Sequence, residues 1–418
     1  MNLADRFEKS LQPDSLALIR LIQTEAQGLG MPLYLVGGSV RDQFFGSVIK
    51  DFDLTVEGDA IRLARALAKK HGGRVTTHPK FFTATWFADA SHAIDLISAR
   101  SETYSAPGAL PTVQKSTITD DLRRRDFTVN AMALRLDGSG WGELLDPFNG
   151  QADLGGRTIR FLHPKSFMDD PTRMFRAIRY AMRYEFTLEP ETERALFDAE
   201  ARVVLSRLSG ERIRHEFDLI FEEQAAVSML AEIAKLDLLR TIHASLPTAN
   251  SQKLTAIPAE LPDEFGQFAL PDILSLRQTL GWILYLMPLP ATDITSVAGR
   301  LAFPALLTRP ARAASSLLSD LPSFKDWKPS QWTFHLDELP ALAVYAAWLA
   351  TSEPALRNYL THWRNVKPIT TGDDLKKRGL EPGPKFKEIL TRLRAARLDG
   401  EAATEEEEKK LLGDFSNQ

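Results

Sequence analysis

Two carboxylates two residues apart, Asp51 and Asp53, constrain this chain more than any other feature of its sequence. They belong to the segment Asp-Phe-Asp-Leu-Thr-Val, whose alternation of polar and apolar residues predicts a β-strand. Side chains at positions i and i+2 of a strand point to the same face. Adjacent like charges cost free energy unless a cation lies between them, and Mg²⁺ prefers carboxylate oxygens. We therefore predict Asp51 and Asp53 as catalytic metal ligands, although a lone pair of this kind also fits a solvated strand end.

A glycine turn precedes this strand. The segment LVGGSVRD at residues 35–42 predicts a strand, a tight turn and a helix. Glycine lets backbone N–H groups approach a phosphate, while a serine hydroxyl and an arginine guanidinium add donors. Gly38, Ser39 and Arg41 are therefore candidate phosphate-binding residues. A glycine turn alone is often only a connection, but the whole order has the layout of a phosphate cradle facing a metal pair.

A further carboxylate, Asp95, interrupts the apolar run Ala-Ile-Asp-Leu-Ile at residues 93–97. We expect a strand here, because β-rich residues are bounded by polar ones. Burying a lone charge is costly, so Asp95 should have a metal ion or a basic partner. A catalytic role and a structural salt bridge both fit this pattern.

Arginine is dense in two segments, and these are the places to look for phosphate or base recognition. In RRRDFTVN, residues 123–130, the candidates are Arg125, Asp126 and Asn130. Aspartate and asparagine can pair with exocyclic base groups, and arginine can contact base edges or phosphate. An arginine run also fits an ordinary exposed surface.

The second segment, DDPTRMFRAIRY at residues 169–180, predicts a helix that runs to about residue 184, with an aspartate N-cap and proline at its first position. Four polar side chains recur at every third position along it: Asp170, Arg173, Arg176 and Arg179. Such spacing gives a slowly drifting stripe down one helix face. The stripe is either a solvated basic surface or a surface that pairs with a base and holds triphosphate or RNA backbone.

Strand and helix signals alternate between residues 33 and 145, and helical signals dominate from about residue 153 onward. The fold class we expect is α+β: an N-terminal head with a mixed sheet and helices, followed by an all-α neck, body and tail. The expected limits are 1–152 for the head, 153–222 for the neck, 223–350 for the body and 351–418 for the tail. Helices are expected at 191–205, 209–222, 225–235 and 274–287, and the four prolines within 247–271 predict an irregular connector. The acidic run at 405–408 is interpreted as a solvated helix face.

Composition limits the kinds of molecule that this chain can be expected to bind. The net charge of −4 gives no overall attraction to nucleic acid, so an RNA partner would need local basic patches. Cysteine is absent, which fits a reducing cytoplasm, and no apolar run approaches the about 18 residues that cross a bilayer. The eight histidines occur singly, which argues against a histidine-built metal site. The N-terminus lacks the pattern of a signal peptide.

Six blocks in order resemble the class II tRNA nucleotidyltransferases and bacterial poly(A) polymerases, members of the polymerase-β nucleotidyltransferase superfamily. The blocks span roughly residues 33–220 and read LVGGSVRD, DFDLTV, RRDFTVNAMA, LLDPFNGQADL, DDPTRMFRAIRY and SGERIRHE. A weaker match continues in TGDDLKKRGLEPGPKFKEIL and ARLDG.

The resemblance implies metal-dependent addition of CCA, from CTP and ATP, to the 3′ end of tRNA without a nucleic-acid template. It implies that Gly38 and Arg41 contact the triphosphate, and that Asp51 and Asp53 hold catalytic Mg²⁺. It also implies that Asp170 and Arg173 pair with the incoming base in the neck, and that the tail binds tRNA. The remaining nucleotide-binding residues that it implies are Arg125, Asp126, Asn130, Arg176 and Arg179. No membrane and no protein partner are expected.

Two positions depart from the family pattern. The fifth block usually opens with Glu-Asp and here reads Asp169-Asp170, and Phe82 stands where many relatives have glycine.

Several alternatives stay open. The enzyme could add only A or only CC; residues 100–120, which would hold the loop used in switching from C to A, are not visibly shortened, which argues against CC-only addition. A poly(A) polymerase would be expected to end in a basic tail, whereas this chain ends acidic. A nucleotidyltransferase for a small molecule or a protein would not need the arginine blocks. An inactive RNA-binding module would be expected to have lost one of the paired aspartates.

Overall fold

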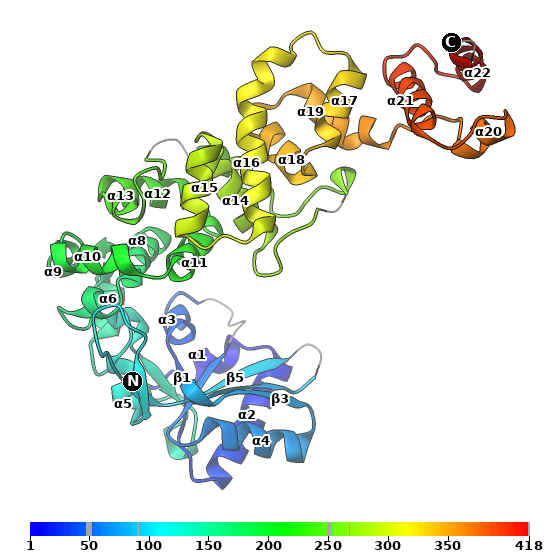
Figure 1. The fold of residues 1–418 in the computed structure, drawn as a ribbon. Coiled ribbons are helices and arrows are strands. Elements are labelled where there is room, and N and C mark those ends of the chain that lie inside the picture. Colours follow the sequence, from blue (N-terminus) through cyan, green and yellow to red (C-terminus); the bar gives the residue numbers. More distant parts are fainter. Residues whose placement is uncertain (47–51, 90–91, 249–251, 267, 417–418) are drawn as a thin grey trace. The chain divides into compact units, whose positions relative to one another are not determined.

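A computed structural model describes residues 1–46, 52–89, 92–248, 252–266 and 268–416. Asp51 lies outside these ranges, so the structure does not test its predicted role. The chain divides into two compact units, Met1–Leu208 and Ser209–Gln418 (Figure 1). The first contains a mixed sheet with helices and the second is helical, which confirms the expected fold class.

The sheet of the first unit has, within the described residues, the strand order β3-β4-β5-β2-β1-β8-β9. Its strands are β1 (Leu33–Val36), β2 (Asp53–Val56), β3 (Arg74–His78), β4 (Thr83–Phe87), β5 (Ala93–Ser98), β8 (Ala133–Arg135) and β9 (Leu144–Leu145). β2 and β5 are parallel, and the other neighbouring pairs are antiparallel. A separate hairpin consists of β6 (Arg100–Thr103) and β7 (Thr112–Lys115), and the short strands β10 (Thr158–Ile159) and β11 (Thr187–Leu188) pair in parallel.

The register of the sheet decides which side chains share a face. Leu35 pairs with Leu54, and Leu54 pairs with Leu96, so these buried leucines lie on one face. Alternation then directs Asp53 and Asp95 to the opposite face. On that opposite face β1 is covered through Tyr34 and Val36, whereas Asp53 and Asp95 of β2 and β5 remain exposed.

Helices complete the first unit. They are α1 (Ala4–Lys9), α2 (Pro13–Gly28), α3 (Gly38–Gln43), α4 (Ala60–His71), α5 (Ile118–Arg123), α6 (Gly150–Gly155), α7 (Ser166–Asp169), α8 (Thr172–Tyr184), α9 (Pro190–Ala195) and α10 (Ala199–Arg207). α4 packs on β4 and β5, whereas α5 packs through Ile118 and Leu122 on Tyr34 and Val36 of β1.

The helix expected at 191–205 is instead two helices, α9 and α10. Asp198 begins the second by accepting a hydrogen bond from the Ala201 backbone N–H at 2.9 Å. An aspartate N-cap starts a helix rather than continuing one, because its side chain replaces a missing backbone partner.

The second unit is built from α11 (Gly210–Phe221), α12 (Ala226–Lys235), α13 (Leu238–Ile242), α14 (Leu276–Leu286), α15 (Ala291–Arg300), α16 (Ala305–Asp320), α17 (Pro329–Asp337), α18 (Ala341–Thr351), α19 (Pro354–Thr361), α20 (Gly372–Lys377), α21 (Pro384–Leu398) and α22 (Glu405–Ser416). The expected helices at 209–222, 225–235 and 274–287 correspond to α11, α12 and α14. The described part of 247–271 contains only short 3₁₀ turns, as the prolines predict. None of the helices in the described ranges is long and apolar enough to cross a membrane.

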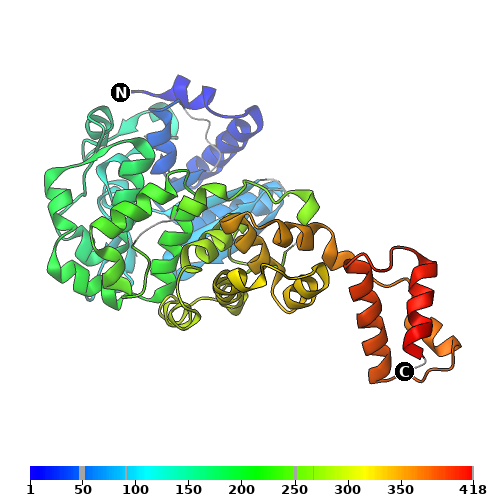
Figure 2. The same cartoon turned by 90° about the horizontal axis from the view of Figure 1, so that it is seen from above.

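Helices α20, α21 and α22 share a small core of their own, in which α21 and α22 lie side by side (Figures 1 and 2). The interpretation of residues 405–408 as a solvated face is wrong at one position. Glu408 is fully buried and accepts hydrogen bonds from the backbone N–H groups of Ile369, at 2.9 Å, and Thr370, at 2.6 Å. The carboxylate faces inward because those two N–H groups need an acceptor.

Candidate functional site

Asp53 and Asp95 lie directly opposite each other on the parallel strands β2 and β5. Both side chains are exposed. Continuing the antiparallel register of β1 and β2 brings Asp53 beside Val36, immediately before the glycine turn. Two oxygen-donor carboxylates on one open face fit the donor set that Mg²⁺ prefers.

The premise that Asp95 is buried is wrong. The strand is apolar only on its core face, and Asp95 alternates with the buried residues Ile94 and Leu96. Its carboxylate accepts a hydrogen bond from the Thr85 hydroxyl at 2.6 Å and forms no ion pair with a basic side chain of the described ranges. The salt-bridge alternative therefore finds no support in this part of the chain.

The glycine turn joins β1 to α3 and packs against arginine. Gly37 has a φ of 72°, and a side-chain carbon on it would lie 2.5 Å from Arg125 Nη1. Only glycine adopts this conformation readily and leaves that space. A carbon on Gly38 would lie 3.2 Å from Arg41 Nη2, while Ser39 occupies the first turn of α3. The turn thus brings two predicted arginines against the backbone that was expected to approach phosphate.

A buried polar chain connects three of the predicted blocks. Arg41 Nη1 donates to Asn130 Oδ1 at 2.6 Å, and Asn130 Nδ2 donates to Asp126 Oδ1 at 3.0 Å. Arg176 donates two hydrogen bonds to Asp126 Oδ2, from Nε at 2.8 Å and from Nη2 at 2.6 Å. Side chains from α3, the RRRDFTVN segment and α8 therefore form one network, which three separate sequence motifs could not reveal.

The ionisation of Asp126 follows from this network. Burial by itself would raise the pKa of the carboxyl group, but the charge of Arg176 and the hydrogen bonds from Asn130 and Arg176 outweigh burial and lower the pKa to about 2. The carboxylate is therefore charged at neutral pH, and it holds Arg176 in one orientation.

Arg173 is also fixed by hydrogen bonds. Its Nη1 donates to Ser166 Oγ at 2.7 Å, and its Nη2 donates to the carbonyl oxygen of Arg124 at 2.8 Å. Asp170 lies just before the helix, where its Oδ1 accepts from the backbone N–H of Thr172 at 3.0 Å. The predicted cap is therefore displaced by one residue: α8 begins at Thr172, its N-cap is Pro171, and Asp170 lies one position before the N-cap.

The alternative of a solvated basic stripe on α8 is wrong. Arg173 and Arg179 are 6% and 4% exposed, and the side chain of Arg176 is 32% exposed. Because the stripe winds slowly around the helix, some of its arginines face neighbouring segments of the chain. Those segments supply carboxylate, hydroxyl and carbonyl oxygens as hydrogen-bond acceptors.

The sequence motifs did not predict a second cluster of charged side chains, which contains Arg125 and lies beside the network of Arg41, Asp126 and Arg176. Asp121 is fully buried and pairs with Arg124 at 2.8 Å and with Arg125 at 3.2 Å. Burial opposes ionisation, but the two arginines outweigh it and lower the pKa of Asp121. Arg124 also contacts Glu102 of the β6–β7 hairpin at 2.8 Å. The sequence signal for Asp121 was its helical spacing of three and four residues from Arg124 and Arg125, whereas Glu102 lies in a distant segment that no local pattern connects to them.

The two departures from the family pattern have local consequences. Phe82 adopts the left-handed conformation, with φ 55° and ψ 39°, which glycine adopts at lower cost. The Asp169 carboxylate lies 3.7 Å from His163 Nε2, and burial lowers the pKa of that imidazole, which opposes an ion pair at neutral pH.

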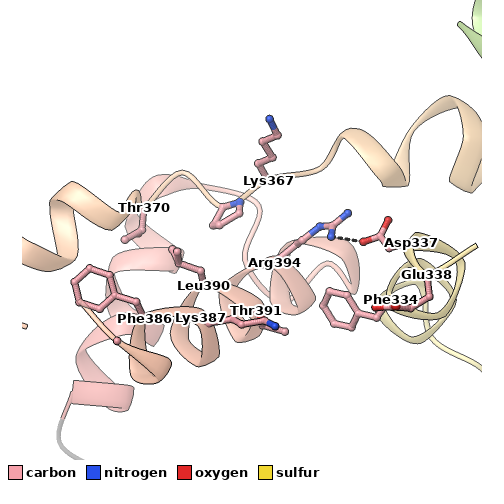
Figure 3. A pocket seen from close by; sticks show the side chains of 12 residues that line it. Phe334, Asp337, Glu338, Lys367, Thr370, Phe386, Lys387, Leu390, Thr391 and Arg394 are labelled. Carbon is pink, nitrogen blue, oxygen red and sulfur yellow. Dashed lines mark hydrogen bonds and ion pairs between the residues drawn. The ribbon is translucent and has the colours of Figure 1, made fainter. Parts of the chain in front are cut away.

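The second unit has a groove of about 800 Å³ between α17 and α21 (Figure 3). Lys367, Lys387 and Arg394 line it together with the rings of Phe334 and Phe386. Asp337 pairs with Arg394 at 2.5 Å, so part of the positive charge is neutralised within the groove.

Known proteins similar to this chain share both its sequence and its fold. Residues 33–160 match the family described as "Poly A polymerase head domain", and residues 185–252 match "Probable RNA and SrmB-binding site of polymerase A". An A-adding tRNA nucleotidyltransferase of Halalkalibacterium halodurans is 33% identical over 100% of this chain and 96% of its own length. An A-adding tRNA nucleotidyltransferase of Geobacter sulfurreducens is 34% identical over 96% of this chain, which spans only 47% of that protein.

Solved structures give the same result. A CCA-adding enzyme in an apo form has a TM-score of 0.82 and 30% identity, with 99% of both chains covered. The Thermotoga maritima CCA-adding enzyme complexed with tRNA has a TM-score of 0.76 and 28% identity, and a CCA-adding enzyme complexed with ATP has 0.80 and 28%, each over 99% of both chains. The described site and these full-length matches agree that the chain belongs to the family of tRNA nucleotidyltransferases and poly(A) polymerases.

Proposed function

We propose that this chain transfers a nucleotide to the 3′ end of tRNA and that it adds only the terminal adenosine. The observation that carries this proposal is the pair Asp53 and Asp95, in register on an open sheet face beside a glycine turn lined with arginine. The relative of Halalkalibacterium halodurans, which is matched over nearly its whole length and is named as an A-adding enzyme, supports the choice of nucleotide.

In the proposed reaction, the 3′-hydroxyl oxygen of tRNA attacks the α-phosphorus of ATP and releases its proton to water. A new O–P bond forms, the bond to the bridging oxygen of the β-phosphate breaks, and pyrophosphate leaves with that oxygen. Mg²⁺ held by Asp53, together with Asp51 and the neighbouring Asp95, would supply the positive charge that such a transfer requires. The metal ligands and the nucleotide-binding roles remain part of the proposal.

The chain's own residues would position the nucleotide. Arg41, next to Gly38, would contact the triphosphate, with Ser39 as a further donor. Arg173, whose two terminal nitrogens are held by Ser166 and the Arg124 carbonyl, would present its remaining edge to the base together with Asp170. Fixed donors cost no reorganisation when the transition state forms. Asp126 would keep Arg176 in place, and Arg125, Asn130 and Arg179 would complete the pocket.

The RNA would be held mainly by the helical unit, whose tail we expected to bind tRNA. Lys367 and Lys387 in the groove between α17 and α21 are suited to phosphate contacts, because duplex RNA is recognised largely through its backbone and shape (Figure 3). A cytoplasmic location and activity without a protein partner belong to the same proposal.

Complete CCA addition is the second candidate. It is favoured by the CCA-adding enzyme that matches 99% of this chain at a TM-score of 0.82. The hairpin of β6 and β7, with its connecting residues, is present as an ordered element where the switching loop was expected.

Incorporation of labelled CTP and ATP into three tRNA transcripts, ending before CCA, after C and after CC, separates these candidates. Extension of the CC-ending transcript alone supports terminal A addition, and completion of all three supports CCA addition. Asp53→Asn should abolish incorporation, whereas Asp14→Asn, at an exposed position on α2, should leave it unchanged. No incorporation into any transcript by the unaltered protein would refute the proposal.

A further inference from the structure

Phe45 is a large apolar side chain that remains 45% exposed directly after helix α3. Single exposed apolar residues are common on proteins and need no explanation. The position of this ring is less ordinary, because α3 also carries Gly38 and Arg41 of the candidate nucleotide site. Phe45 is connected to Arg41 through Tyr184, whose ring contacts both side chains.

The ring of Phe45 ends a row of stacked aromatics. It stacks on Tyr184 with ring centroids 5.3 Å apart and planes inclined by 9°. Tyr184 in turn stacks on Tyr180, at 6.3 Å and 26°. Tyr180 accepts a hydrogen bond from Arg176 Nη2 at 3.2 Å. The row thus runs from the buried polar network of the site outward to an exposed phenylalanine.

Positive charge accompanies this row. The guanidinium carbon of Arg183, which is exposed, lies 5.9 Å from the centre of the Tyr184 ring. That of Arg41 lies 4.6 Å from the same ring, but Arg41 is buried and paired with Asp42 at 2.8 Å, so it supports the ring and Arg183 supplies the outward charge. Stacked rings together with arginines are what unpaired nucleic-acid strands bind, since bases stack on the rings while the backbone pairs with the charges.

We propose that the exposed surface of Phe45 is a platform on which a base of the unpaired 3′ end of the acceptor RNA stacks. This inference rests on the proposed function, and it adds a positioning surface for the acceptor strand. Tyr184 supports the ring from behind, and the platform holds the strand beside the carboxylates.

Steady-state kinetics of the full chain test this with Phe45→Leu, which keeps an apolar side chain but removes the aromatic face. We expect the KM for a CC-ending tRNA transcript to rise about tenfold, since stacking on an aromatic side chain contributes on the order of 1–3 kcal/mol per base. The KM for ATP should not change. Phe45→Trp should retain the low KM, and Phe197→Leu, at another exposed phenylalanine of the same unit, should behave as the unaltered protein.

A binding measurement that needs no catalysis separates this inference from the proposed function. A short RNA with 2-aminopurine at its 3′-terminal position should lose fluorescence on binding the unaltered protein, because stacking quenches this base. Phe45→Leu should abolish the quenching while its melting temperature stays within about 2 °C, as expected for an exposed site. Quenching that is equal in both proteins, or absent in the unaltered protein, overturns the platform. Quenching lost in Phe45→Leu without nucleotide incorporation by either protein supports the platform and refutes the proposed activity alone.

Discussion

At the scale of single residues, Asp126 is the charged group that connects most of the hydrogen bonds in the candidate site. It is 6% exposed, yet it receives hydrogen bonds from Arg176, Asn130 and the backbone N–H of Phe127. A buried carboxylate with this many donors is stable as an ion, whereas one left alone would be protonated. The same residue that resembles a nucleotide-binding position therefore also stabilises the fold around it.

Replacing Asp126 by asparagine should destabilise the first unit by about 3 kcal/mol, because the buried carboxylate to which Arg176 and Asn130 donate would become a neutral amide and Arg176 would lose its counter-charge. Urea unfolding at pH 7 measures this loss. The double variant Asp126→Asn with Arg176→Met should recover part of it, since no unpaired charge remains. A loss below about 1 kcal/mol in the single variant would mean that solvent screens the pair.

The pH dependence of the same pair has a definite sign. The folded-state pKa of about 2 is below the ordinary value of 3.8, so the stabilisation is fully present well above pH 3.8 and is lost as the pH falls through 2. At roughly 1.4 kcal/mol per pKa unit, the loss amounts to about 2.5 kcal/mol. The difference in stability between the unaltered protein and Asp126→Asn should therefore shrink between pH 4 and pH 2 in the same urea titrations.

At the scale of elements, α22 illustrates how one buried contact sets the role of a helix. Glu405, Glu406 and Glu407 are exposed, and Glu408 points inward to cap the backbone before α20. Burial opposes ionisation of Glu408, but the N–H donors of Ile369 and Thr370 outweigh it and lower its pKa. Through Glu408, α22 is thus hydrogen-bonded to the segment that precedes α20 and does not only cover the surface of the C-terminal core.

Glu408→Gln should weaken this junction by about 2 kcal/mol, because charge-assisted hydrogen bonds to two buried N–H groups become neutral ones. Hydrogen exchange at the amides of Ile369 and Thr370 should accelerate correspondingly. Glu406→Gln is the matched control, and at that exposed position exchange should stay within a factor of about 2. Equal acceleration in both variants would show that the helix acts through its net charge.

At the scale of the whole molecule, the chain consists of two units with separate interiors, and every described candidate nucleotide residue lies in the first. The helical second unit carries the groove with Lys367 and Lys387. Nucleotide chemistry and RNA binding are thereby assigned to different parts of the chain in the proposed function.

Calorimetry of the full chain should therefore resolve two unfolding transitions, only one of which responds to nucleotide. With ATP and Mg²⁺ at about 100 times the dissociation constant, the first unit should gain about 2.7 kcal/mol. The matched experiment with Asp53→Asn should show a smaller gain if Asp53 holds the metal. A shift of both transitions by the same amount would mean that the two units unfold together.

The sequence by itself determined the type of most elements and the positions of the chemical groups. Alternation placed Asp53 on one face of its strand, the glycine turn was identified from Gly37 and Gly38, and helical spacing identified α8, although its N-cap is Pro171 and not Asp170. These features depend on local geometry, which a residue's near neighbours in the chain decide. They sufficed to predict the fold class and the family.

The tertiary structure alone decided which of those groups are buried and what they contact. Asp95 proved exposed because its strand alternates, Arg173 and Arg179 proved buried because other segments cover α8, and Glu408 proved to be a buried cap. The network from Arg41 to Arg176 joins residues more than one hundred positions apart. Burial and pairing depend on surfaces brought together from distant parts of the chain, and no local pattern encodes which surfaces meet.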